Sequence, residues 1–193
     1  MKRHFEAQLA KANTKFMYKL ITPGGNKAKF KSAIDWLLQA NMLLQCTKVE
    51  LPQSPLPAYR ADNHFKLYLS DTGLLTSLAR LHFNEIMQSA ALLYRGFLTE
   101  NYVAQTFFAK ELGLYYWESG NQAEVDFILN LQGDIIPVEV KASDNVRSRS
   151  LRSYMERYRP RYAIRLSARN FGFTDNILSV PLYAAHCIGQ PEL

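Results

Sequence analysis

Residues 124–141, with the sequence EVDFILNLQGDIIPVEVK, constrain the fold of this chain more than any other stretch. β-Branched and aromatic side chains recur through residues 124–129 and 135–141, as is typical of strands. The glycine-containing residues 132–134 between them favour a tight turn. The stretch therefore predicts a β-hairpin.

Three charged residues interrupt the apolar pattern of this hairpin: Asp126, Glu139 and Lys141. Side chains alternate across a strand, so Asp126 shares a face with Glu124, and Glu139 shares one with Lys141. Charges within a sheet cost several kcal/mol unless they are paired or bind a metal ion. Proteins hold Mg²⁺ with one or two carboxylates, water and substrate phosphate. We therefore expect Asp126 and Glu139 to bind Mg²⁺ or Mn²⁺, and Lys141 to orient a metal-activated water.

A solvated charge cluster explains the same three residues without a metal ion. Glu139 and Lys141 are spaced for a same-face ion pair on the exposed side of an edge strand, with Asp126 beside them. Such a pair contributes little to stability. The rest of the chain bears on the choice between these two explanations.

Composition favours a folded protein with a phosphate-rich partner. The 193 residues are 48% hydrophobic and carry a formal net charge of +6, which suits DNA. Neither GxxxxGK[ST] nor GxGxxG occurs in the sequence, so we expect no nucleoside triphosphate site in this chain. The two cysteines are far apart, no apolar run is long enough to cross a membrane, and the N-terminus lacks a signal-peptide core. We therefore expect a cytoplasmic protein with no membrane contact.

Residues 1–62 have the pattern of a small winged-helix-like segment. We predict a helix over residues 1–20, a second helix ending near Asn41 and a strand over Leu43–Val49. The lysines in this segment allow contact with phosphates. An ordinary solvated helical face also explains them, and we favour it because no residue is clearly placed to read bases.

Residues 63–193 predict a second, α/β domain. A strand over Phe65–Leu69 and a capped helix start at residues 70–73 precede the longest helical pattern, residues 90–112, which we expect to stop at Gly113. Glu100 lies among apolar residues of this helix and needs a partner, which the hairpin supplies through a shared metal ion. A surface position at the edge of the helix is the alternative.

After the hairpin, the pattern predicts a helix up to Pro160 and a strand over residues 162–166. A helix that crosses between two strands makes those strands parallel. Arginines are frequent near this helix, and we expect Arg147, Arg149 and Arg152 to contact DNA phosphates. Solvated arginines, or arginines that meet an acidic protein, are the alternatives.

The pattern Asp126, twelve residues, Glu139-x-Lys141 in adjacent strands resembles the active-site signature of the PD-(D/E)xK nuclease superfamily. Val125 stands where many members have proline before the aspartate. The resemblance implies a restriction-endonuclease-like mixed sheet flanked by helices. It also implies that Glu100, Asp126, Glu139 and Lys141 serve metal binding and catalysis.

Longer motifs resemble one prokaryotic family, the domain of unknown function DUF4143 that follows a AAA-type ATPase module. They are AQLAKANTKF, AIDWLLQANMLLQC, FKLYLSDTGLL, LTENYVAQ, AEVDF, PVEVKAS and PLY, in that order. The resemblance implies an ATPase partner, upstream or in trans, and a chain that is either an isolated C-terminal fragment or a shortened product.

Three functions are consistent with the sequence. The first is a Mg²⁺-dependent nucleic-acid phosphodiesterase, in which Asp126 and Glu139 bind metal and Glu100 assists or binds a second ion. The second is a non-catalytic module that binds DNA or regulates the ATPase. The third is a protein-interaction adaptor.

Overall fold

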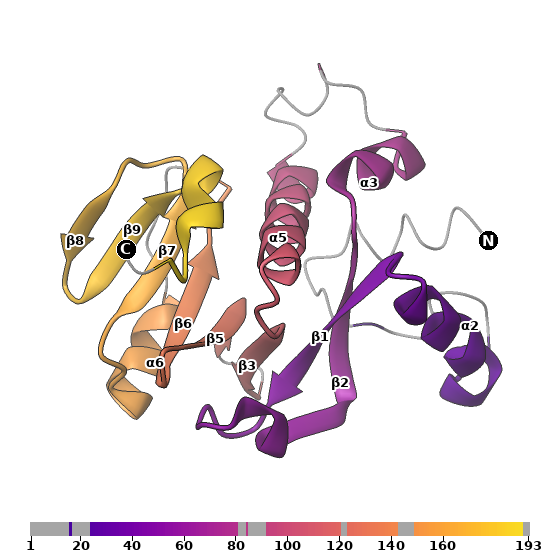
Figure 1. Ribbon diagram of the computed structural model, residues 1–193, viewed down its shortest axis with the longest axis horizontal. Helices are drawn as coiled ribbons and strands as arrows, with labels where there is room; N and C mark the ends of the chain where they lie inside the picture. The colour runs from indigo at the N-terminus through magenta and orange to yellow at the C-terminus, as the bar shows by residue number, and fades with distance from the viewer. Residues whose placement is uncertain are drawn as a thin grey trace.

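The computed structural model describes residues 16, 24–80, 84, 92–120, 123–142 and 149–190. These residues form two mixed β-sheets with helices packed against them (Figure 1), which confirms the α/β class. Most of the helix predicted over residues 1–20, and Arg147, lie outside this part of the chain.

The first sheet has the strand order β2-β1-β3-β4. Its strands are β1 (Leu43–Val49), β2 (Arg60–Leu69), β3 (Tyr115–Ser119) and β4 (Ala123–Val125). β1 pairs antiparallel with β2 and parallel with β3, and β3 pairs antiparallel with β4. β1 confirms the predicted strand, whereas β2 is longer than predicted. The predicted domain boundary after residue 62 lies inside β2, so this sheet joins strands from both predicted segments.

The second sheet has the strand order β5-β6-β7-β9-β8. Its strands are β5 (Phe127–Leu131), β6 (Asp134–Val140), β7 (Ala163–Ser167), β8 (Gly172–Thr174) and β9 (Ile177–Pro181). The antiparallel β5–β6 pair confirms the core of the predicted hairpin, and the parallel β6–β7 pair confirms the predicted crossover. β8 was not predicted.

The predicted first strand of the hairpin is broken at Asp126. β4 ends at Val125 in the first sheet, and β5 begins at Phe127 in the second. Val125 packs in a cluster with Trp117, whereas Phe127 packs in a different cluster with Phe107. The prediction of one continuous strand from residue 124 is therefore wrong, and Asp126 lies at the junction of the two sheets.

The helices are α2 (Lys27–Gln39), α3 (Thr72–Leu78), α5 (Leu92–Ala109) and α6 (Arg149–Tyr158), with 3-10 turns η2 (Leu56–Tyr59) and η4 (Leu182–Cys187). The predicted cap of α3 is confirmed, because the Asp71 carboxylate accepts a hydrogen bond from the Leu74 N–H. α5 ends four residues before Gly113, the predicted stop. No helix in the described ranges is long and apolar enough to span a membrane.

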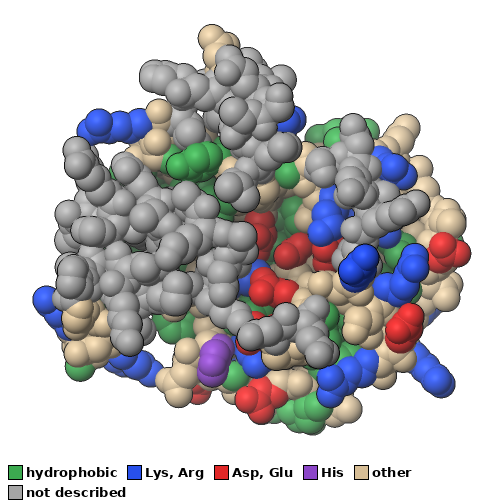
Figure 2. All heavy atoms as spheres, turned by 180° about the vertical axis from the view of Figure 1, so that it is seen from behind, with side chains coloured by type: hydrophobic (Ala, Val, Ile, Leu, Met, Phe, Trp, Pro, Cys, Tyr) green, Lys and Arg blue, Asp and Glu red, His purple; other side chains and the backbone are tan. Residues whose placement is uncertain are grey.

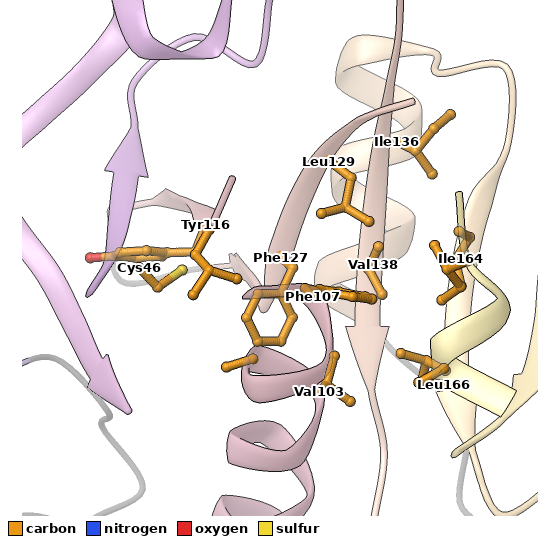
Figure 3. Packing of buried hydrophobic residues seen from close by; sticks show 14 of the residues in the cluster. Cys46, Val103, Phe107, Tyr116, Phe127, Leu129, Ile136, Val138, Ile164 and Leu166 are labelled. Carbon is orange, nitrogen blue, oxygen red and sulfur yellow. The ribbon is translucent and has the colours of Figure 1, made fainter. Parts of the chain in front are cut away.

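α5 and α6 cover opposite faces of the second sheet. Val103 and Phe107 of α5 pack against Phe127 and Val138, and Figure 3 shows these side chains meeting between the helix and the strands. Leu151 and Tyr154 of α6 pack instead with Ile128 and Ala163. Alternation along the strands therefore divides the sheet into an α5 face and an α6 face. Burying each large apolar side chain contributes about 1.5–3 kcal/mol.

Candidate active site

Asp126 lies next to the Glu139–Lys141 pair. The Asp126 Oδ2 accepts a hydrogen bond of 2.7 Å from the Val140 N–H. Val140 is the residue between Glu139 and Lys141, whose side chains form an ion pair with each other. The structure therefore brings together three of the four residues predicted for the site.

Glu139 is buried in the middle of the second sheet. Only 3% of it is exposed, and β6 lies between β5 and β7 rather than at an edge. Because Val138 packs on the α5 face, alternation places the Glu139 side chain on the α6 face. The alternative explanation, a solvated ion pair on an edge strand, is therefore wrong for Glu139.

Glu100 is held by two side chains of β2. Its Oε1 accepts hydrogen bonds from the Lys66 Nζ, at 2.9 Å, and from the Tyr68 hydroxyl. Only 12% of the Glu100 side chain is exposed, so the surface position considered from the sequence is wrong. A buried acid was expected to need a partner, and Glu100 has two, Lys66 and Tyr68.

Lys66 is a fully buried cation that sequence reasoning missed. Its Nζ also lies 2.6 Å from a carboxylate oxygen of Glu124, and 5.0 Å from the ring centroid of Tyr116. Burial lowers the pKa of Lys66, but Glu100, Glu124 and Asp126 outweigh it and raise the pKa well above its ordinary value. Lys66 therefore stays charged. The available signal was a lysine alternating with apolar residues in the strand FKLYL.

Asp126 interacts electrostatically with Glu100 and Lys66, and also with Glu139. Burial raises its pKa most, followed by repulsion from Glu139 and Glu100, whereas Lys66 and the Val140 N–H lower it. The net pKa is well above the ordinary value. Asp126 thus lies between Glu100 on the α5 face and Glu139 on the α6 face.

Acids and cations both surround Asp126. In the part of the chain that the structure describes, Glu100, Glu124 and Glu139 are the nearby acids, and Lys66, Lys141 and Arg165 are nearby cations. Burial and repulsion from Glu139 and Glu100 raise the pKa of Asp126. A carboxyl group in these surroundings favours either a proton or an added cation.

The donor set fits one divalent ion held by two carboxylates. Asp126 and Glu139 are adjacent, and Mg²⁺ uses one or two carboxylates with water and phosphate. Lys66 and Tyr68 both contact Oε1 of Glu100, so this oxygen already has two hydrogen-bond donors. The described ranges contain no group of three or more His, Cys, Asp or Glu side chains arranged to hold a metal ion.

Basic side chains lie beside the acidic cluster. Arg149 and Arg152 occupy the first turn of α6 and are exposed. In Figure 2, acidic side chains gather near the middle of the face, with lysine and arginine side chains beside them over the half built from the second sheet. A pocket of about 570 Å³ lies away from the acidic cluster, at the amino-terminal ends of β6 and β7. Asp134, Arg161 and Tyr162 are among the residues that line it.

Comparison with known families divides the chain into two parts. Residues 95–184 match the family model described as a domain of unknown function, DUF4143, and contain all four predicted site residues. Residues 1–85 match a second model, the domain of unknown function DUF8612. The motifs AQLAKANTKF, AIDWLLQANMLLQC and FKLYLSDTGLL fall in this second match. No curated protein and no solved structure matches the chain.

Proposed function

We propose that residues 95–184 form a PD-(D/E)xK-like module that cleaves nucleic acid with the help of a divalent metal ion. The hydrogen bond from the Val140 N–H to Asp126 carries the proposal, because it holds Asp126 against the Glu139–Lys141 pair. Two carboxylates and an ammonium group are thereby gathered at the carboxyl end of β6. These are the groups that metal-assisted hydrolysis of a phosphodiester requires.

In this proposal Asp126 and Glu139 hold one Mg²⁺ or Mn²⁺ ion. Once bound, the ion supplies a Lewis acid that activates water and neutralises charge on the phosphoryl oxygens. Glu100 contributes through Lys66, by fixing a positive charge close to Asp126. The expected stoichiometry is therefore one ion for each chain, in place of the second ion considered from the sequence.

Lys141 acts as a cation and hydrogen-bond donor. Burial lowers its pKa, but the charge and hydrogen bond of Glu139, together with Asp126, raise it above the ordinary value. The ammonium group therefore keeps its proton at neutral pH and does not serve as a general base. It orients the attacking water, or stabilises charge that develops on the phosphoryl group.

We also propose a AAA-type ATPase as the partner, in the same polypeptide or in trans, because the sequence motifs resemble a family in which such a module precedes this domain. In this arrangement the ATPase moves or remodels the nucleic acid, and the present chain provides the site next to it. The absence of a phosphate-loop motif from the sequence agrees with that division of roles.

A non-catalytic regulatory or DNA-binding module is the second candidate. Lys66 favours it, because this buried ammonium already pairs with both Glu100 and Glu124 without a metal ion. In that case the buried charges serve to join α5, β2 and β4, and the Glu-x-Lys pair is a structural remnant.

Calorimetric titration with Mn²⁺ and a cleavage assay test the proposal together. We expect one Mn²⁺ for each wild-type chain, and cleavage of plasmid or short duplexes in Mg²⁺ or Mn²⁺ but not in EDTA. Asp126→Asn should abolish both signals, because the amide that replaces the carboxylate carries no charge. Asp62→Asn makes the same change at a side chain that is 76% exposed and should alter neither. Wild-type protein that neither binds Mn²⁺ nor cleaves supports the non-catalytic candidate.

A further inference from the structure

The pocket of about 570 Å³ opens on the α5 face of the second sheet, at the amino-terminal ends of β6 and β7. Ile164 of β7 and Leu178 of β9 line it in register with each other, and both pack in the core cluster of this face. α5 ends at Ala109, and Leu112, which follows the helix, also lines the pocket. The volume lies in the range of about 300–1,000 Å³ that is typical of small-molecule sites.

Much of the pocket lining is apolar. Its aliphatic side chains, called the apolar wall below, are Leu112, Leu131, Ile164, Leu178 and Ile188. The aromatic rings of Tyr162 and Phe173 also line the pocket. Phe173 is 62% exposed, although it is in register with the partly buried Leu178, so its ring is open to contact with a ligand. An apolar group that enters the pocket therefore gains by leaving water.

An ion pair marks the mouth of the pocket. The Arg161 Nη1 lies 3.2 Å from the Asp134 Oδ2, both residues line the pocket, and their side chains are 78% and 46% exposed. Asp134 alternates along β6 with Ile136 and Val138 of the core cluster, so it lies on the α5 face, as the pocket does. A guanidinium group has several N–H donors and a carboxylate has two oxygens, so each can hold a ligand while their contact persists.

This pair of charges favours a ligand that carries two opposite charges. A lone anion is attracted by Arg161 and repelled by Asp134, and a lone cation experiences the reverse, so neither gains much from the pair. A zwitterion gains a charged hydrogen bond from each group. In an α-amino acid the ammonium and the carboxylate are bonded to the same carbon atom, so they lie about as close together as the groups of Arg161 and Asp134. The side chain on that carbon is then available to the apolar wall.

We propose that this pocket binds a free α-amino acid with an aromatic side chain, whose carboxylate contacts Arg161, whose ammonium contacts Asp134 and whose ring packs against the apolar wall. Tyr162 and Phe173 favour an aromatic ring over an aliphatic side chain, because paired aromatic rings attract each other beyond the effect of their buried area.

The pocket is separate from the candidate active site. Asp134 begins β6 and lies on the α5 face, whereas Glu139 lies near the end of β6 on the α6 face. At about 3.3 Å per residue, these two positions are about 16 Å apart along the strand. Binding of an amino acid here therefore requires neither a metal ion nor the proposed phosphodiesterase function.

Calorimetric titrations of the wild-type protein in EDTA test which parts of the ligand are recognised. The probes are L-phenylalanine, phenethylamine, which lacks the carboxylate, hydrocinnamate, which lacks the ammonium group, and L-alanine, which lacks the ring. We expect L-phenylalanine to bind at least about tenfold more tightly than each of the other three, because each of them lacks a charged hydrogen bond or the apolar contact. No measurable binding of L-phenylalanine, or equally tight binding of any of the other three, would overturn the proposal.

Neutral variants of the ion pair test the protein side of the contact. Asp134→Asn/Arg161→Gln removes both charges and should bind L-phenylalanine at least about tenfold more weakly than wild type. Arg60→Gln/Asp62→Asn is the matched control, because it makes the same changes in a pair that is 3.5 Å apart and 49% and 76% exposed. The control should retain the wild-type affinity to within about twofold, and both variants should unfold as wild type does on heating, since exposed ion pairs contribute little to stability. Equal affinities of the two variants for L-phenylalanine would count against the pocket.

Backbone amide NMR signals locate the bound ligand. L-phenylalanine should shift the signals of Ile188 and Gly189, which line the pocket, and leave that of Lys141 unchanged. A shift at Lys141 without shifts at Ile188 and Gly189 would overturn the assignment to this pocket. Binding at the pocket by a protein that cleaves no nucleic acid in any metal ion would refute the proposed function and leave this site intact.

Discussion

The ammonium of Lys66 lies 2.9 Å from the carboxylate of Glu100, although 34 residues separate them along the chain. The same ammonium lies 2.6 Å from Glu124, so one buried cation joins β2, α5 and β4. Lys66 thus gives Glu100 a buried partner of opposite charge. Burial, with repulsion from Glu139 and Glu100, raises the pKa of Asp126, which is where we propose that an added cation binds.

Lys66→Met should destabilise the protein by about 3–5 kcal/mol, because it leaves buried carboxylates without their counter-charge. Urea denaturation measures this loss in the free energy of unfolding. Lys31→Met is the matched control: its pair with Asp35 is exposed, at 60% and 44%, and should cost under about 0.5 kcal/mol. Lys66→Met/Glu100→Gln should recover part of the loss. A cost below about 1 kcal/mol for Lys66→Met would contradict the role given to this ion pair.

Tyr68→Phe and Tyr116→Phe should have different effects, although both remove one buried hydroxyl near Lys66. The Tyr68 hydroxyl donates to the charged Glu100, so its loss should cost about 1.5–3 kcal/mol. The Tyr116 hydroxyl is buried and has no hydrogen-bond partner within the described part of the chain, so its loss should be neutral or slightly stabilising. Thermal and urea unfolding of the two variants check the contrast, and equal costs would show that the Tyr68–Glu100 bond contributes little.

Asp126 should make the stability of the metal-free protein fall as the pH rises. Its pKa in the folded protein is raised well above 3.8 by burial, Glu139 and Glu100. The folded state therefore keeps this proton longer than the unfolded state, and the resulting stability is present below about pH 4 and is lost as the pH rises through the raised pKa. In EDTA, the free energy of unfolding of wild type relative to Asp126→Asn should decrease from about pH 4 to about pH 8. A difference that is constant over this range would show that Asp126 titrates normally.

The local parts of the fold could be predicted from the sequence. β1, the β5–β6 hairpin and the parallel β6–β7 pair follow from apolar alternation, from turn residues and from a helix between two strands. The break at Asp126 could not be predicted in the same way, because Val125 and Phe127 are both strand-forming residues. Their assignment to different sheets depends on Trp117 and Phe107, which are distant partners.

The same distinction applies to the candidate site: contacts within one strand could be predicted, and contacts between distant segments could not. Glu139 and Lys141 are two residues apart on one strand, so alternation alone places them together. The partner of Glu100 depends on how β2 packs against α5, a contact between segments far apart in sequence. A lysine that alternates with apolar residues predicts a buried charge, but the acids that neutralise it can be identified only from the fold.

Lys141→Met should separate metal binding from cleavage. The Lys141 ammonium is paired with Glu139, so its removal takes one competing cation away from a carboxylate that is a proposed metal ligand. The affinity for Mn²⁺, measured by calorimetry, should therefore be unchanged or higher than that of wild type. Cleavage should fall by about 10²–10³-fold, since a donor that stabilises developing charge is lost. Loss of Mn²⁺ binding, as expected for Asp126→Asn, or cleavage at the wild-type rate would show that Lys141 does not have this role.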